Sequence, residues 1–247
     1  MIIAGKSKPS IIYARSIRKR AETLGIYTEQ HNLTGEVTDS DLIEAIEKIN
    51  KRREINGIFV ALPLPNNIDK KLVLEAIDPM KDVDGFHPIN MGRLLEGNPV
   101  FIPATAQSII ETINSVQDSI DGKNAVVIGR SNIVGKPVAL LLMQQNATVT
   151  ICHSHTRNLE EVAKRADILV VAIGKPEAIN RNYVKRGAIV IDAGINKVKG
   201  KIVGDVDFDD VKDIAGKITP VPGDIGMLTT LMLLRNTVKA AKLQHKI

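Results

Sequence analysis

The sequence predicts an α/β protein with two domains, an N-terminal α/β domain and a C-terminal Rossmann-like domain with a parallel sheet. Runs rich in Val and Ile alternate with amphipathic stretches along the chain, which is typical of βα units. A glycine-bounded turn separates one such run from the following helix. The 247 residues, 44% of them hydrophobic, suffice to bury two cores. We place the first domain at residues 1–115, with a C-terminal helix at about 226–247, and the second at 116–225.

In the first half, residues 10–24 are predicted to form a helix that Gly25 ends, and residues 38–52 a second helix that begins with polar caps. A buried strand is expected at 57–61, followed by the loop Leu-Pro-Leu-Pro at 62–65. Short helices are expected at 73–77 and 105–114. Because the prolines of this loop end the strand at 57–61, the carboxyl end of that strand is suited to hold a site.

The second half is a self-contained series of strands and helices. Strands are predicted at 125–128, 148–152, 168–173 and 188–191, and helices at 135–145 and 159–165. This order is Rossmann-like. A last apolar helix at about 226–241 has no strand after it, so we expect it to pack back onto the first domain.

Composition excludes several classes of protein. The net charge of +5 is spread among 28 acidic residues, only 3% of residues are aromatic and Trp is absent, which argues against a nucleic-acid partner. The apolar runs are too short to span a bilayer, so no membrane partner is expected. Cys152 is the single cysteine, and the N-terminus does not resemble a secretory signal. We therefore expect a cytoplasmic protein that binds small anionic ligands.

The turn Gly-Arg-Ser-Asn-Ile-Val-Gly-Lys-Pro at residues 129–137 lies between a predicted strand and helix. Backbone N–H groups and the helix dipole at such a turn favour a pyrophosphate. Ser131 stands where the middle glycine of the usual dinucleotide motif would be, so an ordinary βα turn is the alternative. The predicted cofactor contacts in this turn are Gly129, Arg130, Ser131, Val134 and Gly135.

The second predicted strand of this domain continues into His-Ser-His-Thr-Arg at residues 153–157. NAD enzymes usually carry a carboxylate there for the ribose hydroxyls, and none is present. Together with Arg130, these residues favour the 2′-phosphate of NADP. No acidic or cysteine partner flanks His153 or His155, so we assign no metal.

Five motifs together resemble the methylenetetrahydrofolate dehydrogenase/cyclohydrolase family. They are the Leu-Pro-Leu-Pro loop at 62–65, Lys-Asp-Val-Asp-Gly-Phe at 81–86, the turn at 129–137, Gly-Asp-Val-Asp-Phe at 204–208 and Thr-Pro-Val-Pro-Gly at 219–223. The resemblance implies a folate-binding domain, an NADP-binding domain and a homodimer. It also implies hydride transfer from 5,10-methylenetetrahydrofolate to NADP, giving 5,10-methenyltetrahydrofolate.

Residue by residue, the resemblance implies that Tyr13 lies over the reacting folate and that Asp84 hydrogen-bonds the pterin, both at the catalytic centre. From its position alone, Tyr13 would be assigned to the core and Asp84 to a turn. Arg130 and Ser154 match the contacts to the 2′-phosphate, and Gly174 and Ile195 are also predicted to contact the cofactor. The residues expected to close over the folate are Pro220, Val221, Pro222 and Gly223.

The chain departs from the family at the residues that the family uses for cyclohydrolase activity. The family uses a lysine one helical turn after the tyrosine and a glutamine before the Leu-Pro-Leu-Pro loop, whereas this chain has Ile17 and Ala61. Neither side chain can act as a general base, and the guanidinium of Arg20 stays protonated. We therefore expect a dehydrogenase whose cyclohydrolase activity is weak or lost.

Smaller departures are Asp-Ile-Gly-Met at 224–227, Ala-Thr-Ala at 104–106 and a short N-terminus. Three alternatives stay open. Both activities persist through a rearranged water site, or the protein is a non-catalytic sensor of folate or NADP, or it is a related dehydrogenase of the shikimate type. The Pro-Val-Pro-Gly loop and the Asp-Val-Asp-Gly loop argue against the last.

Overall fold

A computed structural model describes residues 1–246. The chain divides into two compact units, one formed by Met1–Ala104 and Thr230–Ile247 and the other by Thr105–Thr229. The division falls between Ala104 and Thr105, whereas we placed the boundary at the end of the following helix. Helix α5 (Ala104–Val116) thus belongs almost wholly to the second unit.

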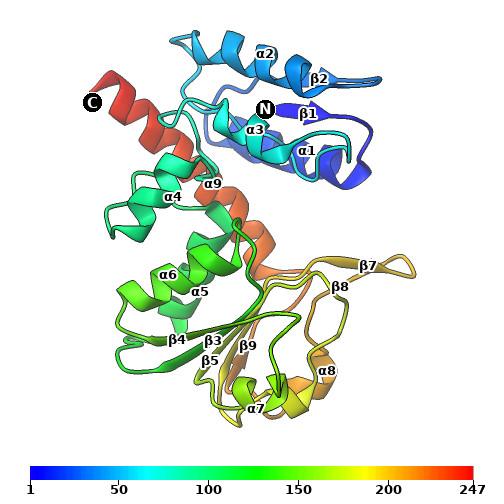
Figure 1. The fold of residues 1–247 in the computed structure, drawn as a ribbon, viewed down its shortest axis with the longest axis vertical. Coiled ribbons are helices and arrows are strands. Elements are labelled where there is room, and N and C mark those ends of the chain that lie inside the picture. The colour runs from blue at the N-terminus through cyan, green and yellow to red at the C-terminus, as the bar shows by residue number, and fades with distance from the viewer. Residues whose placement is uncertain (247) are drawn as a thin grey trace. The chain divides into compact units, whose positions relative to one another are not determined.

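The first unit is built on a small parallel sheet of β1 (Ile2–Ala4) and β2 (His31–Leu33). Its helices are α1 (Lys8–Thr23), α2 (Asp39–Asn50), α3 (Lys70–Glu75) and α4 (Pro88–Leu95). Figure 1 shows α2 on one side of the two strands and α1 on the other. Aliphatic side chains from the strands, α2 and α3 form one buried core.

Caps define the helix starts as the sequence indicates. Ser7 caps α1, with Pro9 in its first turn, and Thr38 and Asp41 form a capping box at the start of α2. The predicted strand at 57–61 is less regular than expected. Ile58 forms an isolated bridge with Asp82, and Val60 forms one with Ile2.

The second unit contains a five-stranded parallel sheet in the order β4-β3-β5-β6-β9. These strands are β3 (Asn124–Ile128), β4 (Thr148–Cys152), β5 (Ile168–Val171), β6 (Ile189–Asp192) and β9 (Lys217–Ile218). Figure 1 shows α5 and α6 (Gly135–Gln144) on one face, and α7 (Leu159–Ala163) and α8 (Phe208–Val211) on the other. This placement of helices on both faces is the doubly wound arrangement.

Several short elements were not predicted. They are β2, α4, α8, β9, the single-turn helix η1 (Arg181–Tyr183) and the antiparallel hairpin of β7 (Asn196–Val198) and β8 (Lys201–Val203). The predicted strands and helices of the second unit all occur, with ends shifted by a few residues at most.

Helix α9 (Asp224–His245) belongs to both units. Near its start, Thr229 shares a hydrogen bond of 2.9 Å with Ser108 of α5. In its later part, the side chain of Asn236 donates to the carbonyl oxygens of Val83 and Ile102. The predicted return of the last helix to the first domain is therefore confirmed. Within residues 1–246, no helix combines the length and apolar character needed to cross a membrane.

Candidate active site and cofactor-binding turn

Tyr13 lies on α1 with its ring edge-on to Phe59, at a centroid distance of 5.8 Å and an angle of 71°. Its hydroxyl hydrogen-bonds the side chain of Thr230 on α9, a partner more than 200 residues away that no sequence pattern indicates. Burial, and after it the nearby charge of Asp84, raises the pKa of Tyr13. The phenol therefore stays neutral across the physiological range.

Asp84 lies near Tyr13 in the first unit, so the fold brings the two predicted folate-site residues together. Burial, together with the charge of Asp82, raises the pKa of Asp84 to about 8. At neutral pH its carboxyl is thus mostly protonated, and it can both donate and accept hydrogen bonds.

The loop that carries Asp84 is held from both sides. Asp82 accepts N–H groups of Phe86 and His87 at 3.2 and 2.8 Å, and the side-chain amide of Asn90 at 2.8 Å. Gly85 has a φ of +74°, and a Cβ there would lie 2.8 Å from the backbone of Ile102. The motif at 81–86 is therefore a rigid platform for Asp84.

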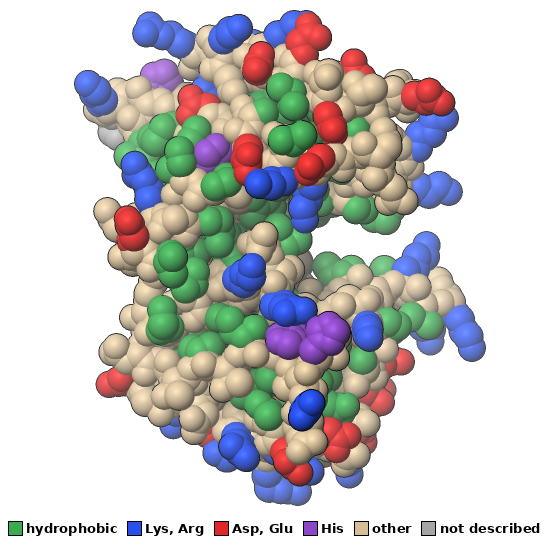
Figure 2. Space-filling model, viewed as in Figure 1, with side chains coloured by type: hydrophobic (Ala, Val, Ile, Leu, Met, Phe, Trp, Pro, Cys, Tyr) green, Lys and Arg blue, Asp and Glu red, His purple; other side chains and the backbone are tan. Residues whose placement is uncertain are grey.

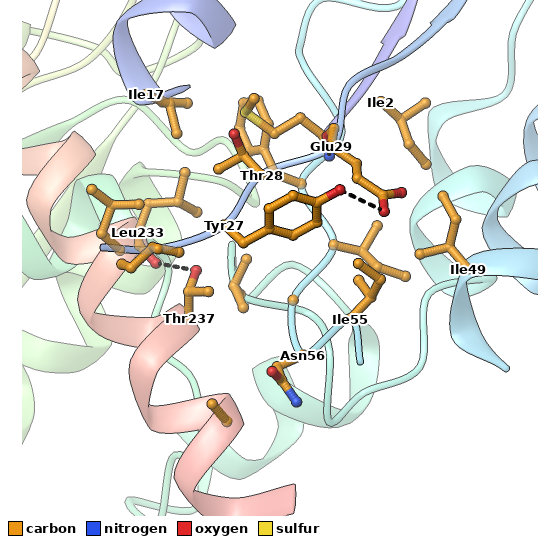
Figure 3. A pocket seen from close by; sticks show the side chains of 18 of the residues that line it. Ile2, Ile17, Tyr27, Thr28, Glu29, Ile49, Ile55, Asn56, Leu233 and Thr237 are labelled. Atoms are coloured by element: carbon orange, nitrogen blue, oxygen red, sulfur yellow. Dashed lines mark hydrogen bonds between the residues drawn. The ribbon is translucent and has the colours of Figure 1, made fainter. Parts of the chain in front are cut away.

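Ile17 and Ala61 are both buried, with 2% and 1% of their surface exposed. Ile17 lines a largely apolar cavity of about 270 Å³ between α1, the segments 26–31 and 54–59, and α9. Figure 3 shows Ile17 and Leu233 on its walls, together with the hydrogen-bonded pair Tyr27 and Glu29. Among the described residues, neither Tyr13 nor Asp84 lines this cavity.

The predicted cofactor turn requires both of its glycines. Gly129 follows β3 with a φ of +131°, and a Cβ there would overlap the carbonyl oxygen of Ala172. A Cβ on Gly135, at the start of α6, would overlap the carbonyl oxygen of Gly129. Ser131, in the place of the middle glycine, accepts the N–H groups of Val134 and Gly135 at 3.2 and 3.4 Å. The turn is thus tight enough to bring a helix N-terminus to a pyrophosphate.

The ends of β3 and β4 bring Arg130 and Ser154 to neighbouring positions. Ile128 pairs with Cys152, and the N–H of Gly129 donates to the carbonyl oxygen of Cys152 at 2.9 Å. Arg130 and Ser154 each follow two residues later, and both are exposed. The rings of His153 and His155 pack edge-on at this edge, with a centroid distance of 5.9 Å. Figure 2 shows histidine side chains, in purple, with Lys and Arg side chains beside them. The edge carries the cations and hydroxyl that a phosphate monoester requires.

The remaining predicted contacts also lie in the second unit. Gly174 follows β5 with a φ of +64° and open space where a Cβ would be, and Ile195 is 68% exposed. The loop at 220–223 follows β9, and a Cβ on Gly223 would lie 2.9 Å from the carbonyl oxygen of Pro220. Gly174 and Ile195 are therefore open to a ligand, whereas the loop at 220–223 is closely packed against itself.

Two models of one protein family match this chain. Residues 1–84 match the catalytic domain of tetrahydrofolate dehydrogenase/cyclohydrolase, and residues 103–245 match its NAD(P)-binding domain. The chain belongs to the tetrahydrofolate dehydrogenase/cyclohydrolase family. The second unit lies wholly within the part of the chain that matches the NAD(P)-binding domain. Both the predicted family and the predicted α/β fold are confirmed.

Individual relatives match this chain over nearly its whole length. The chain is 52% identical to the bifunctional protein FolD of Acetivibrio thermocellus over 248 residues, covering 100% of this chain and 87% of the relative. The crystal structure of the FolD dehydrogenase/cyclohydrolase from Campylobacter jejuni has a TM-score of 0.94 at 42% identity, covering 98% of this chain and 87% of that one. The Trypanosoma brucei FolD enzyme, complexed with NADP cofactor and inhibitor, has a TM-score of 0.94 at 39% identity, covering 100% and 86%.

More distant structures share the fold alone. The shikimate 5-dehydrogenase of Thermus thermophilus has a TM-score of 0.62 at 13% identity, covering 98% of each chain. Such similarity carries no substrate, because one fold supports many activities. The shikimate-type alternative therefore has no support beyond architecture.

Proposed function

We propose that this protein oxidises 5,10-methylenetetrahydrofolate to 5,10-methenyltetrahydrofolate with NADP, and that its cyclohydrolase activity is weak or absent. The observation that carries the first clause is the full-length match to relatives named bifunctional FolD, with Tyr13 and Asp84 brought together. The second clause rests on Ile17 and Ala61, which the family resemblance matches to the positions of the family's lysine and glutamine.

Asp84 would bind the pterin ring of the substrate. A neutral carboxyl offers one donor and one acceptor, which matches the amide and amino groups along a pterin edge. The raised pKa of Asp84, about 8, supports this role at neutral pH. Tyr13, whose hydroxyl is engaged by Thr230, would place its ring against the folate without exchanging a proton.

Bound NADP would supply the hydride acceptor for the one-carbon bridge. Arg130 and Ser154 would hold its 2′-phosphate at the edge of β3 and β4, and the turn from Gly129 to Gly135 its pyrophosphate. The absence of a carboxylate among residues 153–157 supports NADP over NAD, because an acidic side chain would repel the phosphate.

Hydrolysis of the methenyl bridge needs a group that accepts a proton from water. The aliphatic side chains of Ile17 and Ala61 cannot do so, and both are buried. Without another base, the methenyl product would leave the protein and hydrolyse in solution or on another protein.

One observation favours the alternative in which both activities persist. The carboxyl of Asp84, with a pKa of about 8, titrates close to neutral pH and lies near Tyr13. Its ionised fraction could serve as the base for a differently placed water molecule. We further propose, from the family resemblance, that the protein is a cytoplasmic homodimer; light scattering after gel filtration tests the dimer.

The deciding experiment mixes purified protein with 5,10-methylenetetrahydrofolate and NADP and follows methenyl formation by absorbance. Methenyltetrahydrofolate alone is then added, and its decay is compared with buffer. We expect production with decay at the buffer rate. Accelerated decay would refute the second clause, and binding of both ligands without turnover would refute the first in favour of a sensor.

Two double variants sharpen the hydrolase test. Ile17→Lys with Ala61→Gln restores the family's side chains, and we expect decay at least about tenfold above buffer from the regained base. Ile17→Met with Ala61→Met, of similar length but without polar groups, is the matched control and should stay at the buffer rate. Equal rates in both variants would contradict the role given to positions 17 and 61.

A further inference from the structure

Two carboxylates lie buried at the carboxyl edge of the sheet in the second unit. Asp192 ends β6 and is 3% exposed, and Asp205, in the loop after β8, is 0% exposed. Oδ1 of Asp192 accepts the N–H groups of Gly194 and Asp205 at 2.8 and 3.0 Å, and Oδ2 accepts that of Val206 at 2.8 Å. Asp192 therefore fixes the chain on both sides of the hairpin β7–β8.

Asp205 extends this arrangement to the end of β5. Its Oδ2 accepts the N–H groups of Ile173 and Gly174 at 2.6 and 2.9 Å, and its Oδ1 accepts the side-chain amide of Asn196 at 2.8 Å. A Cβ on Gly194 would overlap the carboxyl group of Asp205. The side chain thus touches backbone directly, and little freedom is left to the segments that carry Gly174 and Ile195.

Every hydrogen-bond partner of the two carboxyl groups is a neutral N–H donor. In the described part of the chain, neither Asp192 nor Asp205 forms an ion pair. Burial, and more weakly the charge of Asp205, raises the pKa of Asp192, and its three backbone N–H bonds oppose that shift only in part. Because all partners donate and none accepts, the ionised form of each carboxyl matches its surroundings. The result is negative charge without a compensating cation.

The order of strands places these charges relative to the cofactor. A dinucleotide lies across the carboxyl ends of a doubly wound sheet, and β3 and β4 carry the residues suited to its pyrophosphate and 2′-phosphate. The nicotinamide half of the dinucleotide must then lie toward β5 and β6. Gly174 follows β5, Ile195 follows β6, and Asp205 and Asp192 hold both segments.

We propose that Asp192 and Asp205 are positioning residues for the nicotinamide half of the cofactor, and that their negative charge makes the protein prefer the oxidised over the reduced form. This inference rests on the proposed function, since it needs NADP in this site. The nicotinamide ring is positively charged when oxidised and neutral when reduced, and the rest of the molecule is the same. A fixed negative charge nearby therefore stabilises the oxidised form selectively.

The test measures the dissociation constants of NADP⁺ and NADPH for the full-length protein, by NADPH fluorescence and by displacement, in Asp205→Asn and Asp192→Asn. Asparagine removes the charge at nearly the same size. Because its NH2 group would face N–H donors, we also expect both affinities to fall, and the charge effect is therefore read from their ratio. For each variant we expect the ratio of the NADP⁺ constant to the NADPH constant to rise about threefold to tenfold, the effect of one charge at an effective dielectric of about 20. Asp207→Asn is the matched control, because Asp207 caps α8 two residues away and asparagine also caps. Its ratio should not change.

Asp205→Glu separates charge from fit. It keeps the charge but does not fit against Gly194, so both affinities should fall together with the ratio unchanged. A role confined to folding would move both constants equally in every variant, and a ratio within about twofold of wild type in the asparagine variants would overturn the proposal. Thermal melting shows which variants fold, and Asp192→Asn carries the test if Asp205→Asn does not. Wild-type protein that binds neither form would overturn the proposed function, and this inference with it.

Discussion

The raised pKa of Asp84 predicts that replacing it with asparagine stabilises the protein in a pH-dependent way. The folded carboxyl loses its proton near pH 8 and the unfolded one near 3.8. Between these values the unfolded chain binds fewer protons, so the free energy of unfolding falls as pH rises. Asparagine stays neutral and removes this slope.

The size of the effect follows from the shift. Each pKa unit corresponds to about 1.4 kcal/mol, so the ceiling between pH 5 and pH 8 is about 4 kcal/mol. Asp84 is partly exposed, and solvent screening lowers this figure. We expect Asp84→Asn to gain about 1–2 kcal/mol relative to wild type on going from pH 5 to pH 8.

The assay is urea unfolding followed by circular dichroism at both pH values, with the difference between variant and wild type taken at each. Other titrating groups cancel in that difference. Asp69→Asn is the control, since Asp69 is exposed and asparagine can keep its bond to the N–H of Lys71. A difference for Asp84→Asn that is the same at pH 5 and pH 8 would refute the neutral carboxyl and the pterin contact argued from it.

Three further substitutions test the two units. Lys81→Met removes charge-assisted bonds to the carbonyl oxygens of Asn50 and Arg52. It should lower the free energy of unfolding by about 2–3 kcal/mol in guanidinium titrations, and a loss below about 0.5 kcal/mol would contradict a stabilising role for these bonds. Arg130→Ala should raise the KM for NADP at least about tenfold while that for NAD changes little, and equal changes would contradict a phosphate contact. Gly129→Ala should destabilise the protein by about 2 kcal/mol or more, measured by thermal melting, and weaken NADPH binding, measured by fluorescence. Unchanged stability and binding would show that the turn does not need a glycine at this position.

The parts predicted correctly from the sequence are those fixed by local rules. The helix α2 follows from the Thr38 cap and its apolar spacing. The strand, turn and helix around Gly129 follow from a glycine-bounded turn between an apolar run and an amphipathic stretch. The hairpin β7–β8 was missed because its strands have three residues each and its turn, Lys199 and Gly200, gives a weak signal.

Helix α4 was not predicted, because it begins at a proline directly after a loop motif. In the structure His87 caps the helix through Nδ1, and proline stands in the first turn, where its missing N–H costs nothing. Side-chain roles that depend on tertiary contacts were harder to predict than helices and strands. Asp82 and Asp205 look like surface acids in the sequence, and only the folded backbone shows which N–H groups they satisfy.

The carboxylates near position 17 limit how any hydrolase activity could persist. Hydrogen bonding to Arg52 lowers the pKa of Glu29 to about 2 and also lowers the pKa of Glu54, so neither carboxylate of the cavity beside Ile17 is an effective base. Asp84 is different, because its pKa of about 8 makes its ionised form a stronger base. If the protein does accelerate methenyltetrahydrofolate decay, the excess over buffer should therefore rise between pH 7 and pH 9 and vanish in Asp84→Asn. An excess that survives this substitution would show that a group other than Asp84 accepts the proton from water.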